Sequence, residues 1–319
     1  NLNNMNKNCV KAITLICISF YTLTLNSQDL KQLSSVLSWK DNNTLLFTRL
    51  EKDKRIYQEY NITNRQFAEI AKPVEEAKAG VMVKEGDIYY ISASGTETKI
   101  TETKSEEKNP ELSPDGKLVA FTRDNDLYSV SIDGTNEKRY TNDGTDLILN
   151  GWASWVYYEE ILGRASRYRA FWWSPDSKSI AFMRFDDSKV PMFPIYEPSG
   201  KHGSVVRTRY PKAGDDNPLV RIGFANITNG EVIWADFNEM DDQYFGTPYW
   251  NTNSNELLVQ WMDRDQSDFK LYSVQRDNGN KRVIYKEHQD TWIDWLEEVR
   301  FGSDGLYFVR DFELWEHIY

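Results

Sequence analysis

The chain has 319 residues, which is enough for one large all-β domain or two smaller domains. Its formal net charge of −11 would repel phosphate backbones, and this argues against nucleic acid as a partner. Aromatic residues are abundant, with 11 Trp, 18 Tyr and 15 Phe, and they favour the half-buried surfaces of β-sheets. Long amphipathic helices are hard to find in the sequence.

The first residues have the pattern of an export signal. Met5 is the expected start, and the residues ahead of it lie upstream of that start. Lys7 and Lys11 give a basic segment, and a mostly apolar stretch then runs to a plausible cleavage site near Ser27. This pattern predicts a signal peptide over residues 1–27.

An uncleaved amino-terminal anchor is the alternative, because signal and anchor differ mainly in length, although so short a stretch is marginal for a bilayer. Both cysteines, Cys9 and Cys17, lie inside this segment, so we expect no disulfide in the mature chain. Removing the leader takes away two lysines and no acid, which changes the net charge from −11 to −13. We expect an exported protein, periplasmic or associated with the cell envelope.

From residue 28 onward the sequence repeats one rough unit: an aromatic or aliphatic residue, a polar turn and a short apolar strand. The units begin at Trp39, Leu112, Trp173, Trp250 and Phe301. Asp133-Gly134 and Asn278-Gly279 are dipeptides typical of two-residue hairpin turns, which need positive φ. A sheet of this kind cannot bury both faces alone, and stacking neighbours radially solves that problem. The pattern therefore predicts an all-β fold, a β-propeller with about five blades, or six if residues 86–91 begin a blade of their own.

Two adjacent acids, Glu159 and Glu160, stand among aromatic and aliphatic residues in the segment 155–162. Partial burial would penalise both carboxylates unless a cation were supplied, and a primary ammonium would suit. A solvated turn of an amphipathic helix, with both acids facing water, is the simpler alternative.

Three motifs follow this acidic pair in order. They are WSPD at 173–176, FDDSKVP at 185–191, and RYPKAG at 209–214 with Asn217-Pro218 close behind. Nothing about strands or turns demands this series. It resembles the propeller domain of the dipeptidyl peptidase IV family of serine exopeptidases, most strongly over residues 147–225. Because the family's propeller has eight blades, the resemblance implies that residues 28–319 form a truncated propeller and that the catalytic α/β-hydrolase domain is absent from this chain.

The resemblance also assigns a role to the acidic pair. In the family, paired glutamates on a short helix inserted in the propeller bind the free α-amino group of the peptide substrate, which makes Glu159 and Glu160 the expected clamp. The chain departs from the family pattern at Ser154, where an aspartate is usual, and at Tyr158, the first of three acidic places. The basic stretch 163–169 is longer than the mammalian pattern.

Four weaker assignments follow from the same resemblance. The family uses an arginine from an early blade to hold a substrate carbonyl, and Arg49 and Arg55 lie in about the right region, although a surface position explains each more simply. Trp292 and Trp295 lie where the family lines its pocket with a loop from a later blade, and core packing explains them equally well.

The chemistry of hydrolysis is missing from the sequence. No G-x-S-x-G motif occurs, the three histidines are scattered, and no phosphate loop or metal motif is present, so we expect no catalytic residue, metal or cofactor in this chain. The resulting prediction is the propeller region of an exported serine exopeptidase that releases N-terminal dipeptides of the Xaa-Pro or Xaa-Ala type, inactive by itself. Its expected partners are a peptide with a free amino terminus and the missing hydrolase domain, and a homodimer at full length is compatible with the resemblance. A non-catalytic propeller that binds peptides or proteins, and an inactive family member, are the alternatives.

Overall fold

The computed structural model describes residues 35–41, 43–51, 54–73, 77–296, 299–301, 305–312 and 315–319. The predicted signal peptide, residues 1–27, lies outside these residues. Among the described residues, no helix is long and apolar enough to cross a membrane. The chain divides into two compact units, and the second begins at Ala77.

The first unit contains one antiparallel sheet in the order β1-β2-β3-β4. Its strands are β1 (Ser35–Asp41), β2 (Thr44–Glu51), β3 (Lys54–Asn61) and β4 (Gln66–Ile70). A small core of Leu45, Tyr60 and Ile62 packs against Phe47.

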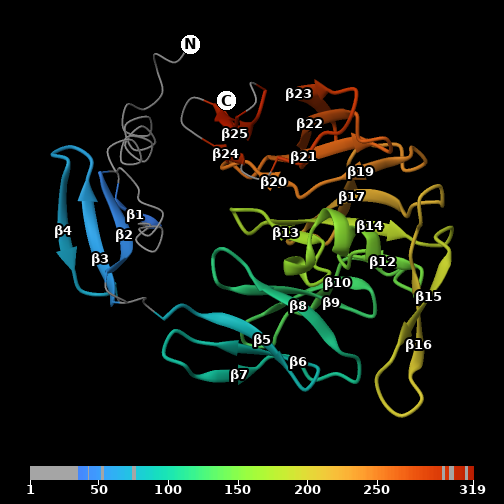
Figure 1. The fold of residues 1–319 in the computed structure, drawn as a ribbon. Helices are drawn as coiled ribbons and strands as arrows, with labels where there is room; N and C mark the ends of the chain where they lie inside the picture. Colours follow the sequence, from blue (N-terminus) through green and yellow to red (C-terminus); the bar gives the residue numbers. More distant parts are fainter. Residues whose placement is uncertain are drawn as a thin grey trace. The chain divides into compact units, whose positions relative to one another are not determined.

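Among the described residues, the second unit contains five blade-like antiparallel sheets that follow one another in chain order, and a separate two-stranded hairpin (Figure 1). The first two are regular meanders. They comprise β5 (Gly80–Lys84), β6 (Asp87–Ile91) and β7 (Glu97–Lys99), then β8 (Glu107–Leu112), β9 (Leu118–Arg123), β10 (Asp126–Ser131) and β11 (Lys138–Arg139).

The next sheet, called sheet β12–β18 below, carries a separate hairpin between its strands β14 and β17. Its own strands are β12 (Ile148–Asn150), β13 (Phe171–Trp173), β14 (Ser179–Asp186), β17 (Leu219–Asn226) and β18 (Val232–Trp234). The hairpin consists of β15 (Met192–Glu197) and β16 (Ser204–Arg209).

The last two sheets complete the described fold. They comprise β19 (Gln243–Phe245), β20 (Tyr249–Trp250), β21 (Glu256–Asp263), β22 (Asp268–Gln275) and β23 (Lys281–His288), then β24 (Val299–Phe301), β25 (Leu306–Arg310) and β26 (His317–Ile318). The predicted all-β propeller architecture is confirmed, and the described residues form six successive blade-like sheets. Residues 86–91 belong to sheet β5–β7, so the sixth unit that the sequence left open is real.

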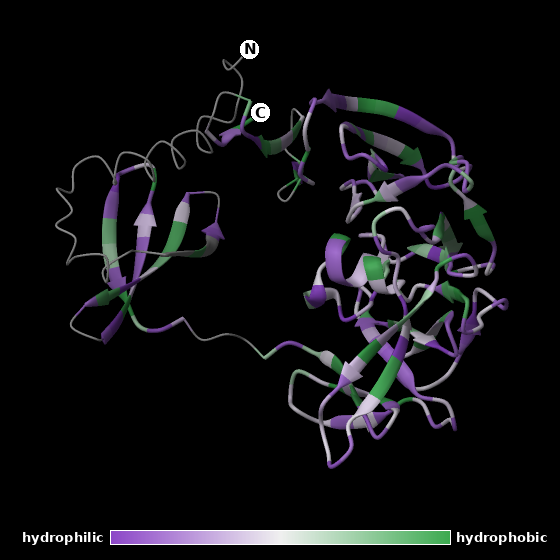
Figure 2. Cartoon of the chain, turned by 45° about the vertical axis from the view of Figure 1, so that its right-hand side comes forward, coloured by the Kyte–Doolittle hydropathy of each residue, from purple (hydrophilic) through white to green (hydrophobic). Residues whose placement is uncertain are grey.

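Cores form between successive sheets of the second unit because the central strands bury both faces. In β14, Ile180 and Phe182 pack toward sheet β8–β11, whereas the alternating Ala181 and Met183 pack toward sheet β19–β23. Side chains alternate along a strand, so a strand buried on both sides reads as a continuous apolar run. Figure 2 shows hydrophobic residues concentrated on strands and hydrophilic residues concentrated in many of the turns.

Hydrogen bonds repeat from sheet to sheet at the innermost strands. The indole Nε1 of Trp173 donates to the carbonyl of Glu111 in the preceding sheet at 3.0 Å, and Trp250 donates in the same way to Trp172 at 3.1 Å. The turns repeat a second bond: the backbone N–H of Asp115 donates to Ser177 Oγ, and that of Asp176 to Ser254 Oγ. These ties fix sheet β12–β18 against the sheets on either side of it, β8–β11 and β19–β23.

Both of these serines adopt the left-handed backbone conformation that favours glycine. Ser177 has φ 59° and Ser254 has φ 62°. At the corresponding place in the turn after β8 the chain has Gly116, with φ 73°. The hydroxyl that accepts a bond from the preceding sheet therefore explains why serine occupies a strained position.

The innermost strand is interrupted at the same point in three sheets. In sheet β8–β11 the interruption is a bulge between Lys108 and Glu111. In sheet β19–β23 it consists of residues 246–248, between β19 and β20, which both pair with β21. In sheet β12–β18 it consists of residues 151–170, between β12 and β13, which both pair with β14. Residues 151–170, called the insertion below, contain the acidic pair.

Candidate functional site

The insertion contains two short helices. A π-helix spans Tyr157–Ile161 and carries both acids, and a 3-10 helix spans Arg164–Ser166. The N–H of Leu162 donates to the carbonyl of Tyr157 at 2.7 Å, which closes the wide π-helical turn. The predicted short helical insertion is thus confirmed, and single π-turns are frequent at functional sites.

The insertion is attached at the interruptions of both neighbouring sheets. Tyr157 is fully buried, packs edge-on against Phe185 at 4.8 Å, and its hydroxyl accepts the backbone N–H of Phe245, the last residue of β19, at 3.1 Å. On the other side, Asn109 Nδ2, in the bulge of β8, donates to the carbonyl of Arg167 at 2.7 Å. These contacts hold the helix that carries the acids at both of its flanks.

Three aromatic rings of the insertion stack on one another. Tyr168 lies between Trp152, at a centroid distance of 4.9 Å, and Tyr158, at 3.7 Å, and all three rings are nearly parallel. Lys108 Nζ lies 4.7 Å from the centre of the Trp152 ring. Tyr158, which departs from the family's acidic pattern, therefore positions the helix by stacking.

The two acids of the pair have different surroundings. The side chain of Glu159 is only 13% exposed, and its Oε2 accepts a 2.5 Å hydrogen bond from Arg164 Nε. Glu160 is exposed, and among the described residues no ion pair reaches it within 4 Å. The cation that a half-buried carboxylate needs is thus supplied to Glu159 by the chain itself, while Glu160 resembles the solvated alternative.

Asp187 is a buried acid beside the insertion that the sequence analysis did not single out; it is part of the motif FDDSKVP. Asp187 directly follows β14, is 5% exposed and has one carboxylate oxygen, Oδ1, that accepts no hydrogen bond from the described residues. Burial raises the pKa of Asp187 to about 6, and the Ser154 hydroxyl and the Arg209 guanidinium oppose that rise more weakly. Only the pattern of two acids after an apolar strand could have signalled it.

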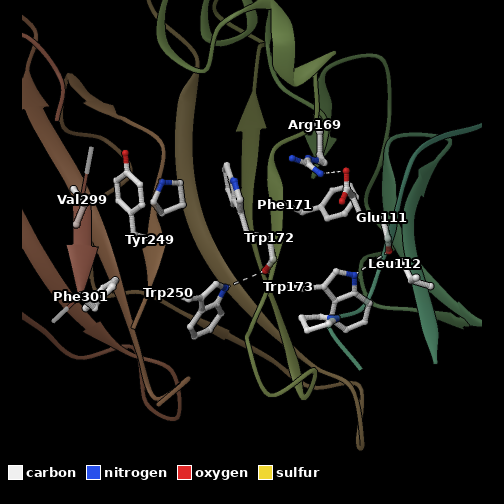
Figure 3. A pocket seen from close by; sticks show the side chains of 12 residues that line it. Glu111, Leu112, Arg169, Phe171, Trp172, Trp173, Tyr249, Trp250, Val299 and Phe301 are labelled. Carbon is white, nitrogen blue, oxygen red and sulfur yellow. Dashed lines mark hydrogen bonds and ion pairs between the residues drawn. The ribbon is translucent and has the colours of Figure 1, made fainter. Parts of the chain in front are cut away.

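A cavity of about 470 Å³ lies between the innermost strands (Figure 3). Half of its lining residues are aromatic, among them Phe171, Trp172 and Trp250. Arg169, from the end of the insertion, forms an ion pair with Glu111 at its edge. Neither Glu159 nor Glu160 lines this cavity.

The four weaker assignments have separate places in the fold. Trp295 is half-buried and packs against Phe269 with ring centroids 6.4 Å apart, as a core residue would. Trp292 is 62% exposed. Arg49 lies in β2 with its Nη2 atom 3.1 Å from Glu51 Oε2, and Arg55 is exposed in β3. Both arginines belong to the first unit, and all four assignments stay predictions.

His288 is exposed and lies between two acids, with its Nε2 atom 3.5 Å from Asp290 Oδ1. His288 Nδ1 lies 3.1 Å from Asp268 Oδ1, and that hydrogen bond raises the pKa of the imidazole. Across the part of the chain that the structure describes, no three potential metal ligands cluster together.

Successive sheets, cores between them and ties at the innermost strands define this chain as a β-propeller region with an acidic helical insertion. Comparison with known families specifies it further. The model of the dipeptidyl peptidase IV N-terminal region matches residues 77–319. The chain therefore belongs to the dipeptidyl peptidase IV family, and residues 77–319 are part of its N-terminal propeller region.

Curated relatives agree with this membership, and a solved structure agrees with the fold. A probable dipeptidyl-aminopeptidase B of Talaromyces marneffei is 37% identical over 168 residues, covering 48% of this chain and 18% of the relative. A probable dipeptidyl peptidase 4 of Emericella nidulans is 30% identical over 230 residues, covering 66% of this chain and 29% of the relative. The crystal structure of Porphyromonas gingivalis dipeptidyl peptidase 4 matches the fold with a TM-score of 0.66 at 23% identity, over 92% of this chain and 46% of that one. The chain thus spans less than a third of the length of these curated relatives.

Proposed function

We propose that this chain supplies the amino-terminus clamp of an exported serine exopeptidase that removes Xaa-Pro or Xaa-Ala dipeptides from peptides. Glu160 and Glu159 would hold the substrate's α-ammonium by charge-assisted hydrogen bonds, which are stronger and more directional than neutral ones. A fixed amino terminus leaves the scissile bond at a fixed distance, so the clamp would act as a ruler for dipeptides. The nucleophile would come from a hydrolase domain outside this chain.

One observation carries the proposal: an exposed Glu160 beside a nearly buried Glu159 on a π-helix rooted in two neighbouring sheets. A solvated surface helix would not need this support. The buried Tyr157 and the stacked Tyr158 leave the acidic end of the helix with little freedom, and such preorganisation reduces the entropy lost on binding.

The test is Glu160→Gln in the protein expressed at its full encoded length, because this change keeps the shape and removes the charge. We expect kcat/KM for a free-amino Xaa-Pro substrate to fall about tenfold or more, since the ammonium would lose a partner at a partly desolvated site. Glu231→Gln, an exposed acid in the turn between β17 and β18, is the matched control and should change nothing. If Glu159→Gln and Glu160→Gln both stay within about twofold of wild type, the clamp assignment is wrong.

The same proposal makes a statement about this polypeptide alone. It should not hydrolyse a chromogenic Xaa-Pro substrate above a blank, because no nucleophile motif is present in its sequence. Turnover that a serine-directed inhibitor abolishes would contradict this. A full-length protein that binds such peptides but never cleaves them would instead support the inactive or purely binding alternatives.

Export is part of the proposal and rests on the leader pattern alone. Mature protein from the native host should begin near Gln28 or Asp29. Amino-terminal sequencing that finds the leader intact would favour the anchor.

We further propose a homodimer at full length, supported by the hairpin β15–β16. The hairpin forms a two-stranded sheet of its own and exposes Met192, Tyr196 and Val205 at 54%, 65% and 57%. A second copy would present the same apolar surface to it, as two-fold symmetry requires. Val205→Glu should then convert a dimer to a monomer in light scattering coupled to gel filtration, and a wild-type monomer would exclude the proposal.

A further inference from the structure

The basic segment 163–169 follows the acidic pair and contains Arg164. This arginine is held by a hydrogen bond and still has donors that no recorded hydrogen bond uses. Arg164 donates from Nε to Glu159 Oε2 at 2.5 Å, yet 76% of its side chain is exposed. Among the described residues, no recorded hydrogen bond uses its two terminal nitrogens. A guanidinium presents five N–H donors in a planar fork, so most of its capacity for a second carboxylate remains available.

Its neighbours differ in this respect. Arg169 is held in an ion pair with Glu111 at the cavity edge. Arg167 is exposed, and its carbonyl is tied to Asn109. Arg164 alone among the three contacts the acidic pair by a hydrogen bond that the structure records.

We infer that Arg164 reads the side chain of the substrate's first residue and favours aspartate or glutamate there. This inference rests on the proposed clamp. If the α-ammonium binds the two glutamates, the Cβ of the same residue is two bonds from the ammonium nitrogen. A carboxylate at the end of that side chain can then reach the free edge of a guanidinium that already touches Glu159. The ammonium of that residue would then meet the two glutamates, and its side-chain carboxylate would meet Arg164.

Charge also sets what the site would reject. A lysine or arginine as first residue would bring a second cation beside Arg164, and like charges repel. Because Arg164 is largely exposed, water and salt screen its interactions, and an exposed ion pair contributes about 0.2–1 kcal/mol. The upper part of that range, about 0.4–1 kcal/mol, corresponds to a preference of about two- to fivefold.

The experiment compares Glu-Pro and Gln-Pro chromogenic substrates, which differ in charge and hardly in shape, with the protein at its full encoded length. Wild type should show a kcat/KM ratio of about two to five in favour of Glu-Pro, falling as salt is raised. Arg164→Gln should bring the ratio to about one, Arg164→Lys should restore part of it, and the matched control Arg167→Gln should leave it unchanged. A general loss of folding would lower kcat/KM for both substrates by the same factor and leave their ratio unchanged.

The outcomes separate this inference from the proposed clamp. If Glu160→Gln cripples both substrates while Arg164→Gln keeps the wild-type ratio, the clamp stands and the role of Arg164 is wrong. A wild-type ratio of one or less, or a ratio that follows Arg167 instead, overturns it as well. If the glutamate variants are harmless, the clamp itself fails. Should the protein lack turnover, the same ratio of equilibrium affinities for the two free dipeptides decides the matter, and binding of neither dipeptide would overturn both.

Discussion

Sheets β12–β18 and β19–β23 share one plan and differ at one point. In both, the innermost strand is interrupted after a strand of three residues, and a glycine, Gly151 or Gly246, begins the interruption. In sheet β19–β23 three residues bridge the gap, whereas in sheet β12–β18 the insertion does. The propeller tolerates a gap there because neighbouring strands hold both flanks, and this makes the gap a place where a binding element can grow without disturbing the cores.

The two sheets also satisfy the gap differently. In sheet β19–β23 the buried Gln260 donates to the carbonyl of Thr247 at 2.9 Å and accepts the N–H of Leu296 at 2.7 Å. The equivalent position in β14 is Met183, where the backbone itself closes the gap: Met183 N–H donates to Ala170, and Ala170 N–H donates to Gly151. A short gap needs a side chain to complete its hydrogen bonds, and the long insertion completes them with its own ends.

Gln260→Met breaks this comparison most directly, because it places in one sheet the residue that the other tolerates. A buried N–H and a partly buried carbonyl would lose their partners, so we expect the free energy of unfolding to fall by about 2–4 kcal/mol. Denaturant unfolding of this chain measures the change. The reverse change, Met183→Gln, buries an amide without a comparable gap to fill and should also lower the free energy of unfolding. If both variants unfold like wild type, the difference between the two sheets does not contribute to stability.

Asp187, beside the insertion, should make the stability of sheet β12–β18 depend on pH. Its pKa is raised to about 6, so the protonated carboxyl is favoured in the folded protein, and the stability this provides is lost as pH rises from about 4 to above 6. A shift of that size corresponds to about 2–3 kcal/mol.

Asp187→Asn should therefore remove that pH dependence and raise stability at pH 8 toward its value at pH 5. The corresponding residue after β21 is Arg264, whose pair with Asp242 is exposed, so Arg264→Gln is the control and should leave the profile intact. Identical pH profiles for wild type and Asp187→Asn would mean that this carboxyl is not desolvated.

Tyr157→Phe tests the hydrogen bond that joins the insertion to sheet β19–β23. The ring keeps its packing, but the N–H of Phe245 loses its acceptor in a buried place, which should cost about 1–2 kcal/mol. Hydrogen exchange at the amide of Phe245 should accelerate. In the full-length protein, kcat/KM for a substrate with a free amino terminus should also fall if this bond positions the π-helix. Tyr158→Phe retains the stack and serves as control.

Ser177 tests the ties that both sheets share and gives the smallest effect. Ser177→Ala loses the bond from Asp115 N–H and keeps the left-handed backbone, at a cost of about 1 kcal/mol. Ser177→Gly loses the same bond but relieves the backbone, so it should cost less than the alanine variant. The opposite order in thermal unfolding would show that the left-handed backbone at this position is not strained, and an alanine variant as stable as wild type would show that the hydroxyl does not matter there.

The sequence predicts the repeated part of this molecule better than the unique part. Apolar runs such as 180–183 and the polar turns before them identify strands buried on both faces, because periodicity and turn chemistry are local. The helical insertion and its acidic pair came from the family resemblance. Neither could reveal that Tyr168 returns to stack on Tyr158, or that Arg164 satisfies Glu159, because such contacts depend on the path of a loop that no periodicity encodes.

Gln260 and Asp187 illustrate the same limit. From the sequence, a glutamine within an apolar strand has no evident role, because its role depends on the gap that it fills. An aspartate after a strand is typical of a turn, and only the structure shows that this one is buried. The positions of Arg49, Arg55 and Trp292 relative to a substrate stay predictions for a related reason: no motif fixes their register.

The central claim is that Glu159 and Glu160 bind the substrate's amino terminus, and a crystal structure of the full-length protein with a bound Xaa-Pro dipeptide tests it most directly. We predict that the α-ammonium nitrogen lies within about 3.2 Å of a carboxylate oxygen of Glu160, and at similar distance from Glu159. A well-occupied dipeptide whose ammonium lies more than about 4 Å from both carboxylates would contradict the account.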